Sequence, residues 1–146
     1  MRFWDSSAIV PLLVSEPGSS GAIAEVEQDG EIIVWWGTQV ECVSAIARLE
    51  REERLDATGT VDAIERLDEL ARAWQEVQPV ERIRQTANRI LRVHGLRAAD
   101  AFQVSAAISA SEGRPASLPI VTLDDRLAQA AEREGFKVVI PSIESA

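Results

Sequence analysis

The segment RFWDSSAIV (residues 2–10) contains the pattern from which the architecture of this chain follows. Two bulky apolar residues are followed by an acid, two serines and an apolar helical pattern, the order expected for a buried strand, a turn and a helix. Two further segments predicted as strands, Ile32 to Trp36 and Ile120 to Leu123, also lead into helical patterns. Strands that alternate with helices predict an α/β fold, a three-layer α/β/α sandwich with a central parallel sheet.

The remaining helices and strands are predicted from the spacing of apolar residues and from the Gly and Pro residues that end helices and strands. Helices are expected over residues 6–14, 22–28, 38–54, 60–74, 81–94, 98–111 and 125–134, a loop over 15–21, and short strands at 76–78 and 137–140. In the helix over 38–54, the residues expected on the apolar side are Val40, Val43, Ile46 and Ala47. Cys42 and His94 are expected to be buried core residues, because free Cys behaves as a small hydrophobe and His94 lies on an apolar stripe.

Size and composition limit the class of protein. A chain of 146 residues that is 46% apolar can bury one core, so residues 1–146 are expected to form a single domain. No apolar run approaches the ~18 residues that a membrane-spanning helix needs. Cys42 is the single cysteine, which excludes an internal disulfide and favours a reducing cytoplasm as the location.

Four acids occupy equivalent places along the chain. Each falls just past a predicted strand or in the first turn of a predicted helix: Asp5, Glu41, Asp100 and Asp124. In an open parallel sheet these places share one edge, outside the carboxyl ends of the strands. Carboxylates that converge there repel one another unless cations neutralise them. The pattern therefore predicts a site for Mg²⁺ or Mn²⁺ with oxygen ligands, acting on a phosphate ester.

Each acid also has an ordinary structural explanation. Asp5 and Asp124 stand where helix N-caps stand, and Asp125 is an equally acidic neighbour of Asp124. Thr38-Gln39-Val40-Glu41 fits a capping box, and Asp100 suits the positive end of a helix dipole. Taken singly, these explanations are the stronger ones. Caps alone, however, could be Ser, Thr or Asn, whereas all four positions are carboxylates, which favours a shared site.

The charge pattern gives a second hint. A net charge of −9 argues against non-specific duplex binding, which needs a basic surface. The exception is the segment 82–97, which has arginines and no acid, so any phosphate-binding surface is expected there: Arg82, Arg89 and Arg92 on one helix face, and Arg97 beyond it. The alternative is a solvated helix face. One Cys and one His are too few for a zinc site, and no glycine-rich nucleotide-binding motif is present.

With these residues in view, the chain resembles the PIN-domain ribonucleases, and most closely the VapC toxins of prokaryotic type II toxin–antitoxin pairs. The resemblance rests on four segments in order: Trp4-Asp5-Ser6-Ser7, the helix headed by Glu41, Gly95 to Ala101 (GLRAADA), and Thr122 to Leu127 (TLDDRL). The register of the last segment selects Asp124 over Asp125.

This resemblance implies a Mg²⁺- or Mn²⁺-dependent endoribonuclease. Its metal ligands and catalytic residues would be Asp5, Glu41, Asp100 and Asp124, with Ser7 and Thr122 as supporting hydroxyls. The resemblance also implies an RNA substrate, a homodimer, and inhibition by a small cognate antitoxin that binds DNA. That antitoxin is expected to lay an apolar helix near Val10, Leu13 and the helix Val61–Trp74, and to place a basic side chain among the acids.

Two other classes of function stay open from the residues alone. A phosphoacceptor signalling domain would also collect acids at the sheet edge, but it would need paired acids after the first strand and a late lysine in the pocket. Here Asp5 is followed by serines, and Lys137 lies in a predicted strand. The other class is a catalytically silent module whose acidic pocket receives an arginine from a partner.

Overall fold

The computed structural model describes residues 1–144 and contains a five-stranded, wholly parallel sheet. The strands are β1 (Arg2–Trp4), β2 (Ile32–Trp35), β3 (Gln75–Val77), β4 (Ile120–Val121) and β5 (Val138–Val139), in the order β3-β2-β1-β4-β5. β1 is central and pairs with β2 on one side and β4 on the other. The predicted parallel α/β architecture is confirmed.

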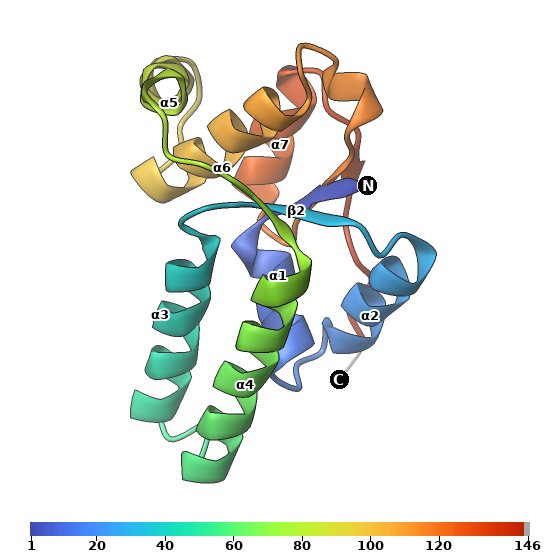
Figure 1. Cartoon of the computed structure of the whole chain (residues 1–146), viewed down its shortest axis with the longest axis vertical. Coiled ribbons are helices and arrows are strands. Elements are labelled where there is room, and N and C mark those ends of the chain that lie inside the picture. The colour runs from blue at the N-terminus through green and yellow to red at the C-terminus, as the bar shows by residue number, and fades with distance from the viewer. Residues whose placement is uncertain (145–146) are drawn as a thin grey trace.

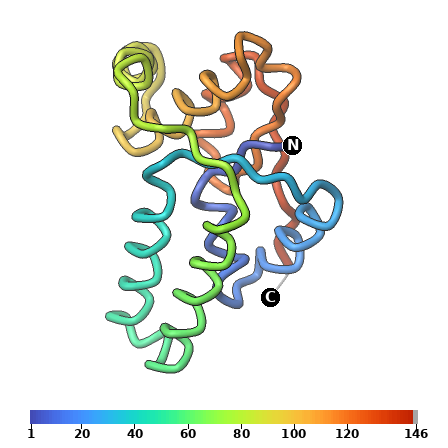
Figure 2. The backbone as a smooth tube through the Cα atoms, viewed as in Figure 1, coloured from blue at the N-terminus to red at the C-terminus, as the bar shows by residue number. Residues whose placement is uncertain are grey.

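Helices cover both faces of this sheet, which Figures 1 and 2 show nearly edge-on. One layer contains α1 (Ser6–Leu13), α2 (Ser19–Gln28), α3 (Thr38–Arg51) and α4 (Ala57–Ala73). The other contains α5 (Glu81–Val93), α6 (Ala98–Ala110) and α7 (Asp125–Arg133), with a short 3₁₀ turn at Pro115–Ser117. None of the helices in residues 1–144 combines the length and the hydrophobicity that crossing a membrane requires.

Alternation along the strands divides the core between these two layers. Successive strand residues point to opposite faces, so Phe3 packs with α5, α6 and α7, whereas Trp4 packs with α1 to α4. β2 and β4 behave alike, with Ile33 on the side of Phe3 and Val34 on the side of Trp4. A strand that is buried on both faces has apolar residues at every position. This is why the continuous apolar run IIVWW (residues 32–36) predicts a buried strand.

Several helix boundaries differ from those expected. α2 begins at Ser19 rather than after Gly21, since Ala22 N–H already donates to the Gly18 carbonyl. The Ser19 hydroxyl accepts from Glu16 N–H and donates to the Val14 carbonyl, which fixes the turn before the helix. Gly21 is tolerated inside the helix because the C-terminal segment passes over it, and a Cβ there would lie 2.2 Å from the Ser142 carbonyl oxygen. α4 begins at Ala57, where Asp56 caps it by accepting from Gly59 N–H.

The apolar side expected for α3 is only partly right. Ile46 and Cys42 are buried as expected, whereas Val40 and Val43 are 67% and 42% exposed. The buried stripe of the helix is formed by Thr38, Cys42 and Ile46, because α1 and α4, not the sheet alone, decide which face is covered. His94 is buried as expected, and its Nε2 lies 2.8 Å from the Glu134 carboxylate.

The order of the strands also places a crevice. From β1 the chain runs outward through β2 to β3, and it then crosses back past β1 to form β4 and β5 on the other side. Such a switch point opens a crevice at the carboxyl ends of the strands, where α/β proteins bind ligands. Asp5 follows β1 directly, and Thr122 follows β4.

Candidate functional site

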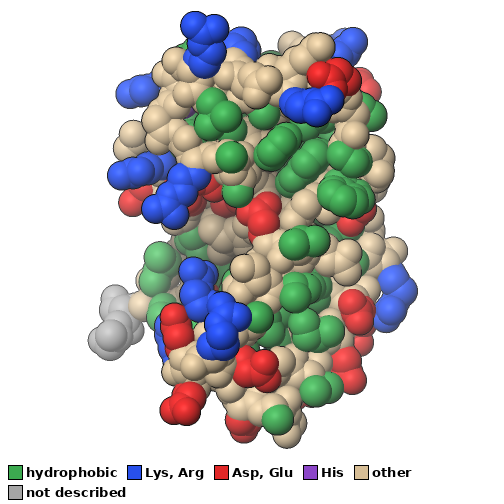
Figure 3. All heavy atoms as spheres, turned by 90° about the vertical axis from the view of Figure 1, so that its left-hand side faces the viewer, with side chains coloured by type: hydrophobic (Ala, Val, Ile, Leu, Met, Phe, Trp, Pro, Cys, Tyr) green, Lys and Arg blue, Asp and Glu red, His purple; other side chains and the backbone are tan. Residues whose placement is uncertain are grey.

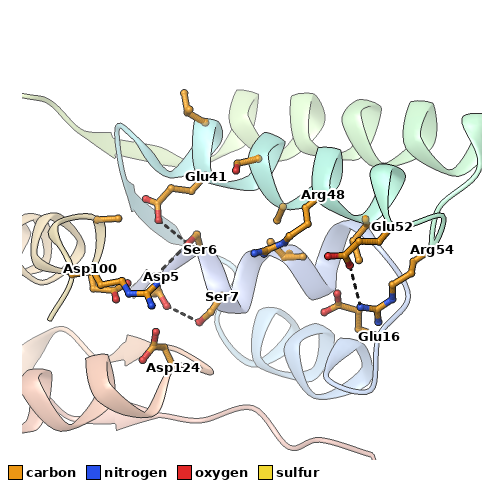
Figure 4. A pocket seen from close by; sticks show the side chains of 17 residues that line it. Asp5, Ser6, Ser7, Glu16, Glu41, Arg48, Glu52, Arg54, Asp100 and Asp124 are labelled. Atoms are coloured by element: carbon orange, nitrogen blue, oxygen red, sulfur yellow. Dashed lines mark hydrogen bonds and ion pairs between the residues drawn. The ribbon is translucent and has the colours of Figure 1, made fainter.

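A cleft of about 1000 Å³ opens at this carboxyl edge, between the two helical layers. The four predicted acids all line it: Asp5, Glu41, Asp100 and Asp124. In the space-filling view of this face, acidic side chains lie in the hollow between the upper and lower layers, with basic side chains beside them (Figure 3). Figure 4 shows the acids converging from β1, α3, α6 and the start of α7. Side chains that are far apart in the sequence therefore share one open space.

Asp5 lies at the floor of the cleft and is only 2% exposed. Although it occupies the N-cap position of α1, its side chain makes no capping hydrogen bond. Instead Oδ2 accepts from the Ser7 hydroxyl at 2.6 Å and from the Thr122 hydroxyl at 2.8 Å. The capping explanation is therefore wrong for Asp5, and the two expected supporting hydroxyls contact this carboxylate.

Glu41 does not close a capping box either. The N-cap of α3 is Gly37, and no side chain caps that helix. The Glu41 carboxylate accepts from the Ser6 hydroxyl at 3.1 Å and from the Gln103 amide at 2.9 Å. Local sequence suggested a bond within α3, but tertiary contacts from α1 and α6 hold the side chain over the cleft.

Asp124 is both a helix cap and one of the acids of the cleft. Its Oδ1 accepts from Leu127 N–H at 3.0 Å and so caps α7, and the same carboxylate lines the cleft. The neighbouring Asp125 is exposed and lies outside the residues that line the cleft. Asp100 lies in the first turn of α6, partly buried and facing the cleft.

The acids perturb one another. Burial is the main reason that the pKa of Glu41 rises to about 7, and the charges of Asp5 and Asp100 add to it. Burial likewise raises the pKa of Asp100 to about 6, with Asp124 and Asp5 contributing and Arg97 opposing. The pKa of Asp5 is also raised, mainly by burial, despite the hydrogen bonds from Ser7 and Thr122. Such a cluster holds protons, or cations, more readily than isolated carboxylates do.

The donor set suits a hard cation, because it consists of carboxylates and hydroxyls. Within residues 1–144, no three Asp, Glu, His or Cys side chains come close enough together to form a complete metal site by themselves. Mg²⁺ is usually held by one or two carboxylates, with waters and substrate phosphates completing its shell. The cleft therefore fits a cation whose coordination is shared with solvent and a phosphate-bearing ligand.

Arginines also line the cleft, but mostly not the predicted ones. Arg97 does, while Arg82, Arg89 and Arg92 do not, and Arg89 instead pairs with Glu134 at 2.9 Å. Arg48 and Arg54 of the α3 region line it as well. Arg48 reaches across the cleft toward α1 in Figure 4. Helical spacing could have found it, because Arg48 stands two turns after Glu41 on the same face of α3.

Other reactive groups lie away from this chemistry. Cys42 is buried, and burial is the main reason that the pKa of its thiol rises to about 12, so it is inert as a nucleophile. Lys137 is exposed and does not line the cleft, which counts against a phosphoacceptor pocket.

A second, more apolar groove runs between α1, α2 and α4. It has a volume of about 350 Å³ and is lined by Leu12, Ile23, Val26, Glu27, Arg66, Glu69 and Leu70. Leu13, which was expected to face a partner, is fully buried, whereas Leu12 faces this groove. Ile23 is 48% exposed, which is unusual for an isoleucine on a packed helix pair.

Comparisons with known proteins agree with this architecture. A family model described as PIN domain matches residues 2–133. Ribonuclease VapC45 from Mycobacterium tuberculosis (strain CDC 1551 / Oshkosh) is 29% identical over 136 residues, covering 93% of this chain and 92% of that protein.

Solved structures share the fold. A crystal structure of FitAcB from Neisseria gonorrhoeae aligns with a TM-score of 0.65 at 19% identity, covering 94% of this chain and 96% of that one. PAE2754 from Pyrobaculum aerophilum aligns with a TM-score of 0.62 at 19% identity, covering 94% and 83% respectively.

Proposed function

The chain belongs to the PIN domain family, and on that premise we propose that it is a Mg²⁺- or Mn²⁺-dependent endoribonuclease, the toxin of a type II toxin–antitoxin pair. One observation carries the proposal: four carboxylates from four separate elements line a single cleft at the switch point of the sheet. The similarity to a protein named as a ribonuclease, over nearly the whole length of both chains, supports the same reaction. We take the whole chain to be one domain of this family.

Each polar residue of the cleft receives a role in this proposal. Asp5, Asp100 and Asp124 would hold the cation, with Glu41 completing the set. A bound divalent ion would polarise the scissile phosphate and lower the pKa of an attacking water. Ser7 and Thr122 donate hydrogen bonds to Asp5, which orient its buried carboxylate and offset part of the rise in its pKa that burial causes. Attack by water would leave a 5′-phosphate and a 3′-hydroxyl.

The arginines of the cleft would bind the RNA backbone. Arg97 lines the cleft, and its charge acts on Asp100. Arg48 lies further along the groove between α1 and α3 (Figure 4). Neither makes an ion pair in the described part of the chain, so both guanidinium groups are available to phosphates. A negatively charged protein can thus bind RNA through a local cationic track rather than through its whole surface.

The partner proposed is a small cognate antitoxin. Its apolar helix would occupy the groove lined by Leu12, Ile23 and Leu70, and a basic side chain would enter the acidic cleft. An apolar groove of this kind suits an amphipathic helix, which lays its hydrophobic face into the partner. A cation from the antitoxin would compete directly with the metal.

We also propose a homodimer, formed through the exposed apolar side chains of α3. Val40 and Val43 are exposed on this helix, and Trp36, just before it, is 50% exposed. Clustered exposed apolar residues beside a functional cleft are typical of protein interfaces. Sedimentation of the purified protein should give a dimer, and Val43→Glu should give a monomer. A wild-type monomer at high micromolar concentration would contradict this proposal.

The function is tested by incubating the purified protein with structured RNA in Mn²⁺, in Mg²⁺ and in EDTA, followed by analysis of the product ends. Cleavage with either metal, abolished by EDTA and leaving 5′-phosphates, is expected. Full activity in excess EDTA would contradict the metal model. Absence of cleavage with intact metal and antitoxin binding would instead favour the alternative, a catalytically silent module whose acidic pocket serves a partner.

A further inference from the structure

Gln103 is a fully buried amide beside the acidic cleft. It stands on α6, one turn after Asp100, and its side chain is 0% exposed. Residues three apart on a helix share a face, so Gln103 lies behind Asp100 as seen from the cleft. A buried amide is costly unless its groups are hydrogen-bonded, which raises the question of what this side chain does.

The amide nitrogen of Gln103 makes two bonds, both to α3. Nε2 donates to the Thr38 hydroxyl at 3.0 Å and to the Glu41 carboxylate at 2.9 Å. An ionised carboxylate only accepts, so with Glu41 ionised, as a cation ligand must be, this contact uses the NH₂ end of the amide. The amide oxygen, Oε1, is buried without a partner in residues 1–144. A position that served only packing would be better filled by Leu or Met, which have no polar atom to leave unpaired.

Glu41 is thereby held at both of its oxygens. Ser6 donates to Oε1 and Gln103 donates to Oε2, from opposite helical layers of the fold. We propose that Gln103 is a positioning residue, which orients the Glu41 carboxylate toward the cation site. In this arrangement α6 contributes one acid of the site, Asp100, and orients a second acid, Glu41, through Gln103. The inference rests on the proposed metal-dependent function, because the cation is what Glu41 is oriented toward.

A purely structural role is the competing explanation. Gln103 could simply tie α6 to α3 through Thr38. The two roles separate cleanly, because Thr38→Val removes that tie and leaves the Glu41 contact in place, whereas Gln103→Met removes both. Methionine has nearly the volume of glutamine and no hydrogen-bond donor, so the core stays filled.

The test measures Mn²⁺ binding to the metal-free protein by calorimetry, with thermal unfolding as the check on folding. Gln103→Met should weaken Mn²⁺ binding about 10- to 100-fold, the usual loss when a group that orients a metal ligand is removed. Thr38→Val should stay within about 3-fold of wild type. RNA cleavage at subsaturating Mn²⁺ should fall in parallel for Gln103→Met and recover at high Mn²⁺.

A double-mutant cycle then assigns the effect to Glu41. In a Glu41→Gln background, Gln103→Met should cause no further loss of Mn²⁺ affinity, because the carboxylate that it orients is gone. An equal loss with and without the Glu41 carboxylate would overturn the positioning role, as would wild-type Mn²⁺ affinity in Gln103→Met. If Gln103→Met does not fold, Gln103→Asn replaces it in the same cycle, because its shorter amide withdraws from Glu41.

Failure of this inference and failure of the proposed function look different. Wild-type protein that neither binds Mn²⁺ nor cleaves RNA would overturn both together. Wild-type protein that binds Mn²⁺ and cleaves RNA, beside an unaffected Gln103→Met variant, would overturn only the role of Gln103.

Discussion

Thr122 and Asp5 are joined by a hydrogen bond of 2.8 Å between a buried hydroxyl and a buried carboxylate, across 117 positions of sequence. The bond ties the end of β4 to the end of β1, which are the two strands that flank the switch point. The same Thr122 hydroxyl accepts from Asp124 N–H at 3.0 Å, so one side chain sets the spacing between two of the acids. The floor of the cleft is thus a property of adjacent strand ends rather than of any loop.

The first prediction compares two adjacent acids. Asp124→Asn should lower metal-dependent RNA cleavage at least 10-fold with little change in stability, because Asn caps helices about as well as Asp. Asp125→Asn is the matched control, since Asp125 carries the same charge but lies outside the cleft. Cleavage rates and thermal midpoints of both variants provide the measurement. Equal cleavage rates for the two variants would show that Asp124 is not part of the metal site.

The second prediction concerns pH and stability without metal. Because the folded protein raises the pKa of Glu41 from 4.5 to about 7, it binds more protons than the unfolded chain within that window. The contribution of Glu41 to stability should therefore be greatest at low pH and should fall as pH rises from about 4.5 to about 7. Since Glu41 is only partly buried, its share is on the order of 1–2 kcal/mol, less than the full pKa change would give.

Glu41→Gln isolates this contribution. The variant should gain stability at pH 8 relative to wild type, and the pH dependence of its stability should flatten, while most of the stabilisation by Mn²⁺ and most of the cleavage are lost. Chemical denaturation at pH 5 and pH 8, with and without Mn²⁺, measures each quantity. A variant that cleaves RNA like wild type at equal Mn²⁺ would show that Glu41 is not part of the metal site.

The third prediction concerns RNA binding. The double variant Arg48→Gln/Arg97→Gln should weaken RNA binding and reduce the slope of its salt dependence by roughly 0.7 for each phosphate that an arginine no longer neutralises. Arg82→Gln/Arg92→Gln is the charge-matched control, because these side chains are exposed on α5 outside the cleft. Binding is measured in EDTA across a salt series. A larger loss of RNA affinity in the control variant would show that the arginines of α5, and not those of the cleft, bind the RNA.

The fourth prediction addresses the antitoxin groove. Ile23→Glu should prevent co-purification with the product of a small neighbouring gene while leaving RNA cleavage unchanged, because a charge would be buried in the apolar groove. Val61→Glu is the control, since Val61 is similarly exposed on α4 but does not line the groove. Co-expression followed by size-exclusion chromatography gives the readout. Retention of the partner by Ile23→Glu, or the absence of any such gene, would count against this groove.

Asp5 and Asp124 show why the local signals of the sequence were ambiguous. Both have the pattern of an N-cap, yet only Asp124 makes the capping bond, and Asp5 turns its carboxylate to Ser7 and Thr122. The difference lies in what is packed nearby. A hydroxyl two residues away competes with the helix N–H groups, and the hydroxyl of Thr122 reinforces it from the next strand.

Local apolar patterns in the sequence were enough to predict the alternation of strands and helices. They also predicted the edge of the sheet at which four acids meet, because parallel strands share one carboxyl edge. The contacts that hold those acids depend instead on the packing of the folded chain. Gln103 on α6 reaches Glu41 on α3 across 62 positions of sequence, and Ser6 on α1 holds the other oxygen of the same carboxylate. Such contacts depend on how whole helices are rotated and seated against one another, and helix rotation is set by the packing of both partners together, which no local pattern contains.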